Sequence, residues 1–253
     1  MKRELSSRGR NISTHPWEPE ALIKAAFFDL GGTLLVMRRD RIFLRVLGEE
    51  GYEADPSTLH SVYARADSWW LSVYGGGVMT PGQTAEAYRS LDEKVFSDLF
   101  PHVSRPEAFR VSSLVRKRWR ELEGEIPLEL YPDAEPTLNR LKKDGYSLAL
   151  VSNAPAETTE TIKSLGLSTY LESVVISGVV GFSKPNPEIF RIALKELGVT
   201  PEEAVHVGDL YEADIVGARN AGIKGLLINR DSPRTDVDCP QIRSLSEVYG
   251  YLA

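Results

Sequence analysis

The chain has 253 residues, of which 42% are hydrophobic and 26% are charged, and its formal net charge is −6. These proportions are ordinary for a soluble globular protein, and the acidic balance argues against a general nucleic-acid binder, which carries a strong basic excess. The single cysteine, Cys239, excludes an internal disulfide and a cysteine-rich metal site. Because the sequence contains no run of about 18 apolar residues, we expect a cytoplasmic protein without a membrane partner.

The N-terminal part of the chain joins a polar segment to a short apolar run. Residues 1–20 carry charges of both signs without hydrophobic periodicity, and they predict a flexible extension. The run 25–28 is typical of a buried strand that ends at Asp29, and Gly31 and Gly32 predict a turn directly after it. Since open α/β sheets bind ligands at the carboxyl ends of their strands, we expect Asp29 to lie at the mouth of a site.

A helical segment follows, from about residue 38 to residue 128. Its apolar residues recur at spacings of three and four, as they do in amphipathic helices. The pairs Asp55-Pro56, Thr80-Pro81 and Arg105-Pro106 predict the starts of helices. Four antiparallel helices would form a small bundle with its own core, and we expect the pair Trp69-Trp70 to lie in that core.

The pattern changes to short apolar strands that alternate with helices from about residue 129. Strands are predicted over 147–152, 174–177, 204–209 and 225–228, and helices over 158–165, 187–197 and 213–220. Such alternation favours a parallel sheet that is covered by helices on both faces. We therefore expect an α/β fold with a doubly wound, Rossmann-like core over 21–37 and 129–253, into which the helical domain 38–128 is inserted.

Several chemically active side chains follow the predicted strands. They are Asp29, Ser152-Asn153 and Asp209 at strand ends, Lys184 in a loop, and Asp214 five residues after Asp209. Repelling carboxylates are costly to gather without a cation, and oxygen ligands without sulfur indicate Mg²⁺. A carboxylate nucleophile, a hard cation and donors for an oxyanion together suit phosphoryl transfer.

Each of these residues also has an ordinary structural interpretation when it is taken alone. An Asp after a strand commonly forms a turn or caps a helix, Ser152 could cap the next helix, and Lys184 could be a surface lysine. It is their joint occurrence in this order that favours a site. His206 lies inside an apolar strand, and we predict a hydrogen-bonded core histidine rather than a ligand.

The order of these motifs resembles the four motifs of the haloacid dehalogenase (HAD) superfamily. The motifs are Asp29-Leu30-Gly31-Gly32-Thr33, Ser152-Asn153, Lys184-Pro185, and Gly208-Asp209 with Asp214. The inserted helices resemble the cap that follows the first motif in that family. The resemblance implies a Rossmann-like core with a mobile cap, and a hydrolase that acts on the phosphate monoester of a small metabolite.

The resemblance also implies roles for individual residues in phosphoryl transfer. Asp29 would attack phosphorus to give an aspartyl-phosphate, which water then hydrolyses. Ser152 and Lys184 would bind the phosphoryl oxygens, with support from Asn153, and Thr33 would brace the nucleophile loop beside the substrate.

A magnesium site is implied as well. Asp29, Asp209 and the backbone carbonyl of Gly31 would contact Mg²⁺, and Asp214 would lie close by, bound directly or through water. Gly31 is also a departure from the family, because the phosphatases carry a second Asp at this position.

In those phosphatases the second Asp protonates the leaving oxygen and later activates water. A positioned general acid or base is worth ~10²–10⁴ in rate, and glycine has no group to do this. Three alternatives follow. The substrates could have good leaving groups, as acyl and aryl phosphates do. Asp40, Arg38, a water or the substrate could replace the Asp. Alternatively, the protein could have lost most turnover and serve as a phospho-ligand-binding or regulatory protein.

Two other kinds of HAD enzyme also lack the second Asp. Haloacid dehalogenases attack carbon without a metal and have a different fourth motif, so Asp209 and Asp214 disfavour dehalogenation. Phosphonate hydrolases need a lysine early in the cap, whereas the helical segment contains only Lys94 and Lys117. A phosphatase is therefore favoured over both. The sequence leaves open whether the protein is a monomer or a dimer.

Overall fold

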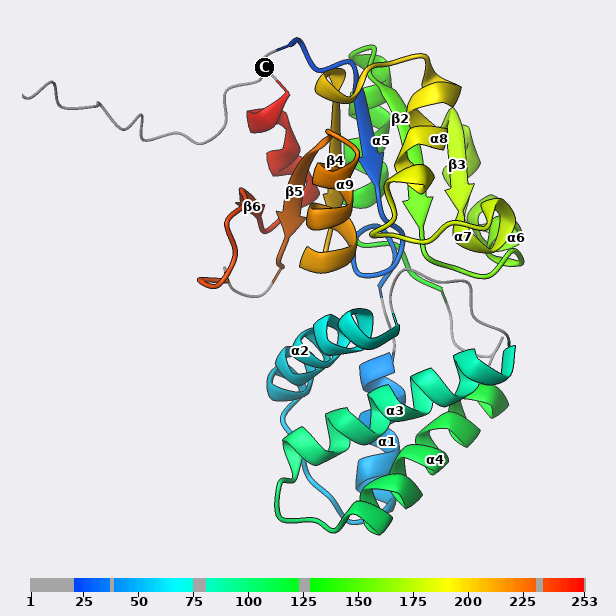
Figure 1. Ribbon diagram of the computed structural model, residues 1–253, viewed down its shortest axis with the longest axis vertical. Coiled ribbons are helices and arrows are strands. Elements are labelled where there is room, and N and C mark those ends of the chain that lie inside the picture. The colour runs from blue at the N-terminus through cyan, green and yellow to red at the C-terminus, as the bar shows by residue number, and fades with distance from the viewer. Residues whose placement is uncertain (1–20, 37–38, 75–80, 123–127, 231–233, 253) are drawn as a thin grey trace, which may run out of the picture.

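The computed structural model describes residues 21–36, 39–74, 81–122, 128–230 and 234–252 (Figure 1). These residues form two units, a sheet covered by helices and a bundle of helices (Figure 1). The predicted N-terminal extension, residues 1–20, lies outside the described residues.

The sheet contains six parallel strands in the order β3-β2-β1-β4-β5-β6. These strands are β1 (Ala25–Phe28), β2 (Ser147–Ser152), β3 (Ser173–Ile176), β4 (Ala204–Gly208), β5 (Lys224–Ile228) and β6 (Gln241–Ile242). The chain enters at the centre and winds outward on both sides, so the strand order reverses between β1 and β4. This order confirms the predicted doubly wound α/β fold, in which ligands bind at the carboxyl edge beside the reversal.

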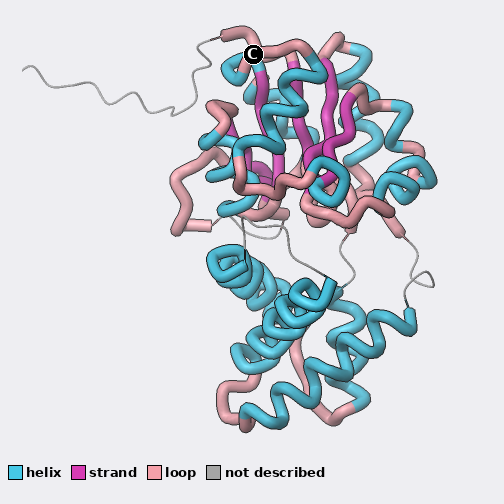
Figure 2. Tube along the Cα trace, turned by 45° about the vertical axis from the view of Figure 1, so that its right-hand side comes forward, coloured by secondary structure: helices cyan, strands magenta, loops and turns pink. Residues whose placement is uncertain are grey.

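Helices cover both faces of this sheet (Figure 2). They are α5 (Ala134–Lys143), α6 (Thr158–Ser164), α7 (Ser177–Val180), α8 (Pro187–Leu197) and α9 (Gly217–Asn220). Shorter helical turns complete the unit: η1 (Leu167–Thr169), η2 (Pro201–Glu203), η3 (Tyr211–Val216) and η4 (Leu245–Tyr251).

Alternate residues of β1 belong to two different apolar clusters. Ala26 and Phe28 pack with residues of α5 and η4, whereas Ala25 and Phe27 pack with residues of α8 and α9. The division arises because successive side chains of a strand point to opposite faces. All four residues are fully buried, which explains why this strand is a continuous apolar run in the sequence.

Four further helices form the second unit, which we call the helical bundle: α1 (Arg39–Glu49), α2 (Pro56–Tyr74), α3 (Pro81–Leu99) and α4 (Arg105–Leu122). Proline stands at the first position of α2 and α3 and at the second position of α4, where its missing N–H costs nothing. The bundle has its own apolar cluster, to which all four helices contribute and against which Trp70 packs. None of the described helices combines the length and the apolar character that crossing a membrane requires.

Two linkers that run side by side join the bundle to the sheet unit. Leu35 and Leu130 form an antiparallel bridge, the N–H of Val36 donates to the carbonyl of Glu129 at 2.8 Å, and the N–H of Tyr131 donates to the carbonyl of Leu34 at 2.8 Å. The bundle faces the carboxyl ends of the strands, where α2 contacts η3 (Figure 1).

The largest local departure from the sequence prediction lies after β4. A helix was expected over 213–220, but the chain forms the π-helix η3 from Tyr211 and continues as α9. A π turn has no 3.6-residue periodicity, so hydrophobic spacing does not reveal it. In addition, Ser177 begins α7 instead of ending β3, and neither β6 nor η4 was predicted.

Candidate active site

The three central strands bring the predicted site residues to one edge of the sheet. Asp29 follows β1, Ser152 ends β2, and Asp209 follows β4, and β1 lies between the other two strands. The backbone N–H of Asp29 donates to the carbonyl of Val207 at 2.9 Å, which continues the pairing of β1 with β4 as far as the carboxylate. Strand order thus gathers residues that are up to 180 positions apart in the chain.

Lys184 joins two of the carboxylates. Its Nζ donates to Oδ1 of Asp29 and to Oδ1 of Asp214, each at 2.6 Å, and the lysine side chain is only 3% exposed. Burial works to lower the pKa of this ammonium group, but the two carboxylates outweigh it and raise the pKa above its ordinary value. Lys184 therefore stays charged, and its ammonium group can attract an anion.

Asp214 is the most fully bonded member of the cluster. Besides Lys184, its Oδ1 contacts Nε2 of His206 at 2.9 Å, and its Oδ2 accepts the N–H of Leu210 at 2.9 Å. Burial works to raise its pKa, but the Lys184 charge and the His206 hydrogen bond hold it well below the usual range. A Cβ at Gly208 would lie 2.1 Å from the Asp214 Cγ, so only glycine fits there.

His206 confirms the prediction of a hydrogen-bonded core histidine. The ring is fully buried and lies edge-on against Phe190, with ring centroids 4.9 Å apart. Burial lowers the pKa of His206, so the ring is neutral at pH 7. A carboxylate can only accept a hydrogen bond, and we therefore assign the proton to Nε2, which donates to Asp214.

Asp209 completes an acidic cluster. One oxygen each of Asp29, Asp209 and Asp214 lie within 4.8 Å of one another. The pKa of Asp209 is raised well above its ordinary value, first by burial and then by the charges of Asp29 and Asp214. Burial also raises the pKa of Asp29, although Lys184 opposes the shift. Burial and the neighbouring carboxylates therefore both disfavour the charged forms of Asp29 and Asp209.

The donor set fits a hard divalent cation. Three carboxylates face one ammonium group, which leaves an excess of two negative charges. The Oδ1 atom of Asp209 is buried and has no hydrogen-bond partner among the described residues. Gly32 allows the approach of this side chain, because its φ is +77° and a Cβ would lie 2.2 Å from Asp209 Oδ2. Oxygen donors without sulfur suit Mg²⁺.

The other residues predicted for the site, Ser152, Asn153 and Thr33, make different kinds of contact. Ser152 is 5% exposed, and its hydroxyl has no hydrogen-bond partner within the described part of the chain. Asn153 uses its amide on the backbone of Lys184, since Oδ1 accepts the Lys184 N–H at 2.7 Å and Nδ2 donates to the Lys184 carbonyl at 2.8 Å. Thr33 is fully buried, and its carbonyl accepts from Arg230 at 2.8 Å.

The bundle contributes one carboxylate that the sequence did not single out. Asp67 of α2 is 8% exposed, and its charge also raises the pKa of Asp209. Arg39 holds this carboxylate with two hydrogen bonds, at 3.2 and 2.9 Å. The sequence contains one sign of this position: Asp67 stands four residues after the buried Tyr63, among residues of α2 that otherwise contribute apolar side chains to the bundle core.

Asp40 and Arg38 are the two side chains that could replace the missing second Asp. Asp40 lies in the first turn of α1, where its carboxylate accepts the N–H of Arg41 at 2.8 Å. It therefore satisfies the start of its own helix. Arg38 lies outside the described residues.

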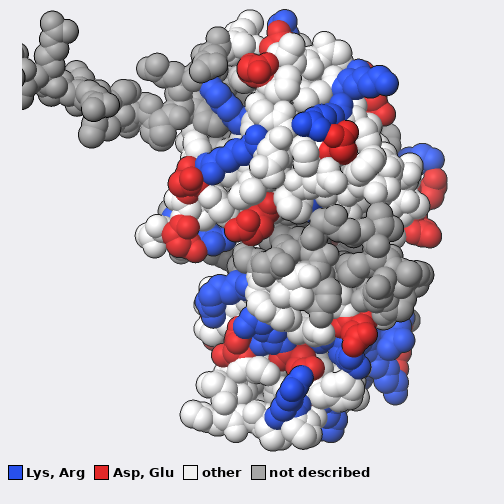
Figure 3. Space-filling view, viewed as in Figure 1, with Lys and Arg blue, Asp and Glu red and all other residues white. Residues whose placement is uncertain are grey.

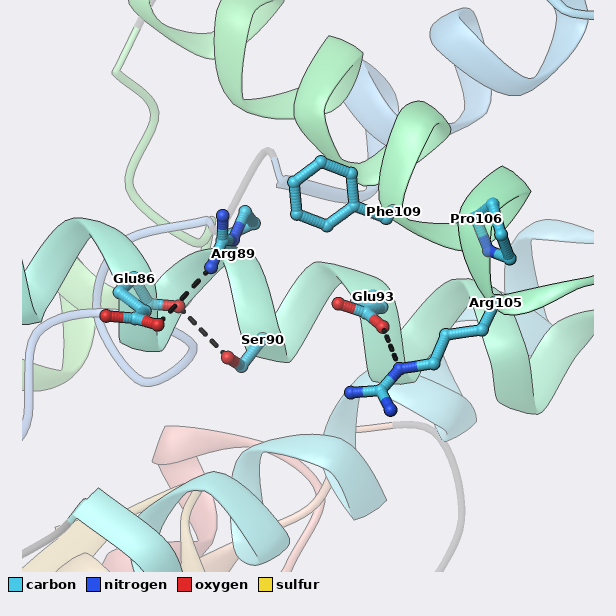
Figure 4. A pocket seen from close by; sticks show the side chains of 7 residues that line it. All are labelled: Glu86, Arg89, Ser90, Glu93, Arg105, Pro106 and Phe109. Carbon is cyan, nitrogen blue, oxygen red and sulfur yellow. Dashed lines mark hydrogen bonds and ion pairs between the residues drawn. The ribbon is translucent and has the colours of Figure 1, made fainter.

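A surface groove of about 420 Å³ lies elsewhere, between α3 and α4 (Figure 4). Its charged side chains pair with one another: Arg89 with Glu86 at 3.4 Å, and Arg105 with Glu93 at 3.4 Å. Because these charges are balanced, the groove has no excess charge for an ionic ligand. On the face shown in Figure 3 acidic and basic side chains alternate over both units, without the single-signed stripe that a nucleic-acid surface has.

Comparison with known proteins agrees with this geometry. A family model described as haloacid dehalogenase-like hydrolase matches residues 23–222. The chain is 43% identical over 119 residues to glyceraldehyde 3-phosphate phosphatase of Methanopyrus kandleri, covering 45% of this chain and 51% of that protein. It is 40% identical over 124 residues to phosphoserine phosphatase of Thermus thermophilus, covering 47% of this chain and 50% of that protein. The chain thus spans about half the length of these curated relatives.

A solved structure extends the likeness to nearly the whole chain. The crystal structure of a HAD phosphatase from Thermococcus onnurineus is similar with a TM-score of 0.57 and 27% sequence identity, and the match covers 91% of this chain and 98% of that one. The resemblance inferred from four short motifs is therefore confirmed. The chain belongs to the haloacid dehalogenase-like hydrolases.

Proposed function

We propose that this protein is a Mg²⁺-dependent phosphatase that hydrolyses small phosphorylated metabolites through an aspartyl-phosphate on Asp29. The observation that carries this proposal is the edge cluster, in which Lys184 bridges Asp29 and Asp214 while Asp209 has a free carboxylate oxygen. The names of the relatives support a small phosphorylated substrate, because they include phosphatases for glyceraldehyde 3-phosphate and for phosphoserine.

Asp29 is the nucleophile of the proposed reaction. One of its carboxylate oxygens bonds to phosphorus while the bond from phosphorus to the leaving oxygen breaks, and the leaving group takes the electron pair. Water then attacks the same phosphorus, which releases inorganic phosphate and restores the carboxylate. The buried contact with Lys184 fixes the orientation of Asp29 before substrate arrives.

Lys184 and Ser152 bind the phosphoryl oxygens. The Ser152 hydroxyl has no hydrogen-bond partner within the described residues, so it is available to donate to a ligand. Lys184 is charged, and Asn153 holds its backbone from both sides. Asn153 therefore acts by positioning Lys184, and the buried Thr33 supports the loop that carries Asp29.

Asp29, Asp209 and the Gly31 carbonyl would hold Mg²⁺, with Asp214 close by, bound directly or through water. When bound, the ion neutralises the excess of acidic charge and withdraws charge from the transferring phosphoryl group. Asp214 already accepts from three donors, which supports a role in holding Lys184 and a weaker role as a ligand.

The helical bundle over 38–128 acts as the cap of this site. The contact between α2 and η3 supports this placement, as does the influence of the Asp67 charge on Asp209. Gly31 provides no acid for the leaving oxygen. The enzyme therefore favours substrates whose leaving groups need little protonation. A single cysteine in the sequence supports a reducing, cytoplasmic location.

The structure gives less support to phosphonate cleavage, which needs a free lysine from the bundle. Lys94 pairs with Asp98 at 3.0 Å and Lys117 pairs with Glu121 at 3.7 Å, in both cases on the surface of their own helix. Neither lysine lies at the edge of the sheet.

The test is phosphate release from an aryl phosphate, an acyl phosphate and an alkyl sugar phosphate, with and without Mg²⁺. The proposal predicts Mg²⁺-dependent release that is fastest for the acyl and aryl esters and is lost in Asp29→Asn. If no ester is hydrolysed but Asp29→Asn still binds inorganic phosphate, the protein is a phospho-ligand-binding protein instead.

A further inference from the structure

The nucleophile loop leads directly into the linker to the helical bundle. Leu34, only five residues after Asp29, accepts the N–H of Tyr131 from the returning linker at 2.8 Å. Any displacement of the bundle could therefore pass through a few backbone bonds to the reacting carboxylate. A device that fixes the loop on the sheet side of the linkers would prevent this.

Arg230, in the loop after β5, contacts both linkers at this point. One of its terminal nitrogens donates to the Thr33 carbonyl at 2.8 Å and to Oδ1 of Asp133 at 3.1 Å, and the other donates to Oδ2 of Asp133 at 2.9 Å. Its guanidinium carbon lies 3.6 Å from the centre of the Tyr131 ring. Thr33 belongs to the outgoing side, and Tyr131 and Asp133 belong to the returning side.

Asp133 in turn ties the linkers to the C-terminal segment. Its Oδ2 also accepts the hydroxyl of Ser244 and the N–H of Leu245, each at 2.9 Å. Burial works to raise its pKa, but the hydrogen bonds from Arg230, Leu245 and Ser244 lower the pKa below its ordinary value. Both side chains of the pair are about one-fifth exposed, so the contact is shielded from much of the solvent.

We propose that Arg230 and Asp133 form a clasp that positions the nucleophile loop and isolates it from the bundle. The proposal rests on the proposed function of Asp29. The clasp holds the Thr33 carbonyl on the sheet side of the bridge between Leu35 and Leu130. Bending of the linkers beyond that bridge then leaves Asp29 in place. Arg230 is thus a positioning residue, which acts through the loop and does not touch the substrate.

The guanidinium is suited to this task because it is planar and offers several donors in fixed directions. It can satisfy a carboxylate through two bonds and still reach a backbone carbonyl. A lysine at the same position has a single nitrogen and would reach only some of these acceptors, which are the two oxygens of the Asp133 carboxylate and the Thr33 carbonyl. A misplacement of about 1 Å in a reacting group can cost on the order of 10²-fold in rate, so a small loosening of this loop is measurable.

The experiment compares Arg230→Met and Arg230→Lys with two matched controls in the full-length chain. Arg219→Met removes an arginine from another Arg–Asp pair, whose side chains are 40% and 74% exposed. Val248→Ala removes apolar bulk from η4, whose first residue bonds to Asp133, at a side chain that cannot hydrogen-bond to Arg230 or Asp133. Measurements are kcat and KM for an aryl phosphate, the thermal midpoint, and hydrogen exchange of the backbone amides of 29–36.

We expect Arg230→Met to lower kcat by roughly 10–100-fold with KM changed by less than about threefold, at temperatures well below its thermal midpoint. Exchange at the amides of Leu34 and Leu35, which bond to the Leu30 carbonyl, should accelerate. Arg230→Lys should be intermediate, and it serves as the test if Arg230→Met does not fold. Both controls should keep the wild-type kcat.

The clasp is refuted if Arg230→Met loses no more kcat than Val248→Ala at an equal loss of thermal midpoint, or if exchange in 29–36 is unchanged. A wild-type protein without phosphatase activity would overturn the proposed function alone, because the exchange measurement still decides whether the clasp holds the loop.

Discussion

The two units of this protein contain buried charge in opposite ways. In the helical bundle the two buried acidic side chains that the structure describes each have an arginine partner, since Arg39 pairs with Asp67 and Arg116 pairs with Asp92. At the edge of the sheet three carboxylates face one ammonium group among the described residues, that of Lys184, which pairs with Asp29 and Asp214.

This difference in charge balance distinguishes the ion pairs that stabilise the bundle from the site proposed to bind a ligand. A balanced pair satisfies its own charge and needs no ligand, whereas an excess of two negative charges makes the unliganded edge costly. Burial raises the pKa of Asp92 in the bundle as well as those of Asp29 and Asp209, but only at the edge do neighbouring carboxylates raise the pKa values of Asp29 and Asp209 further. We therefore expect changes at the edge to alter activity and metal binding, and matched changes at the Arg116–Asp92 pair of the bundle to alter stability alone.

The largest effect is expected from Asp29→Asn. Removal of the nucleophile should reduce kcat by roughly 10⁴–10⁶-fold, because the covalent pathway is lost. The matched change Asp92→Asn in the bundle should leave kcat of the folded protein within about twofold of wild type, since the contacts of Asp92 with Arg116 and Tyr63 lie within the bundle. Steady-state phosphate release at saturating Mg²⁺ measures both. Equal losses of kcat in the two variants would contradict the role of Asp29 as the nucleophile.

Gly31→Asp should restore the missing acid. The φ of Gly31 is not in the left-handed region, so the backbone tolerates a side chain there. For an alkyl phosphate we expect a gain in kcat of at least about tenfold, within the ~10²–10⁴ range of general acid catalysis, and a smaller gain for an aryl phosphate. The ratio of the two rates is the readout. An unchanged ratio would show that another group already protonates the leaving oxygen.

Lys184→Met removes the only ammonium group that the described edge cluster contains. Breaking a buried ion pair typically costs ~3–5 kcal/mol of unfolding free energy, and here two carboxylates lose their ionic partner. Arg116→Met in the bundle should cost less, because only one carboxylate, that of Asp92, loses its ionic partner. Urea denaturation without metal compares the two variants, and added Mg²⁺ should recover part of the loss for Lys184→Met only.

The smallest predicted effect is the dependence of Mg²⁺ stabilisation on pH. Because the pKa values of Asp29 and Asp209 are raised on folding, protons stabilise the metal-free fold, and this contribution is lost as pH rises from 3.8 through the raised values. Mg²⁺ replaces the protons, so the gain in thermal midpoint on adding Mg²⁺ should grow between pH 5 and pH 8. A ligand at about 100 times its Kd adds ~2.7 kcal/mol. Asp209→Asn should abolish the gain, and Asp92→Asn should keep it.

Much of the sheet unit could be predicted from the sequence because its signals are local. A buried parallel strand is a continuous apolar run, and polar residues at the ends of such runs must meet at one edge, which places Asp29, Ser152 and Asp209 together. Lys184 lies in a loop, and only the order of the motifs indicated its place.

Other features depend on contacts that no local pattern encodes. The Arg230–Asp133 clasp joins residues 97 positions apart, and Asp67 enters the site only because α2 lies against η3. The π-helix that carries Asp214 has no periodic signature. Asn153 was expected to support Ser152 and Lys184, but no local pattern shows that its amide bonds to the Lys184 backbone.

The most direct test of the central claim is to trap the covalent intermediate on Asp29. Wild-type protein would be mixed with an acyl phosphate and Mg²⁺, quenched in acid within the first turnover, and digested for mass spectrometry. We expect a phosphoryl group on Asp29 that is absent without Mg²⁺ and in Asp29→Asn. Phosphate release without a phosphoryl group on Asp29, or with one on another residue, would contradict it.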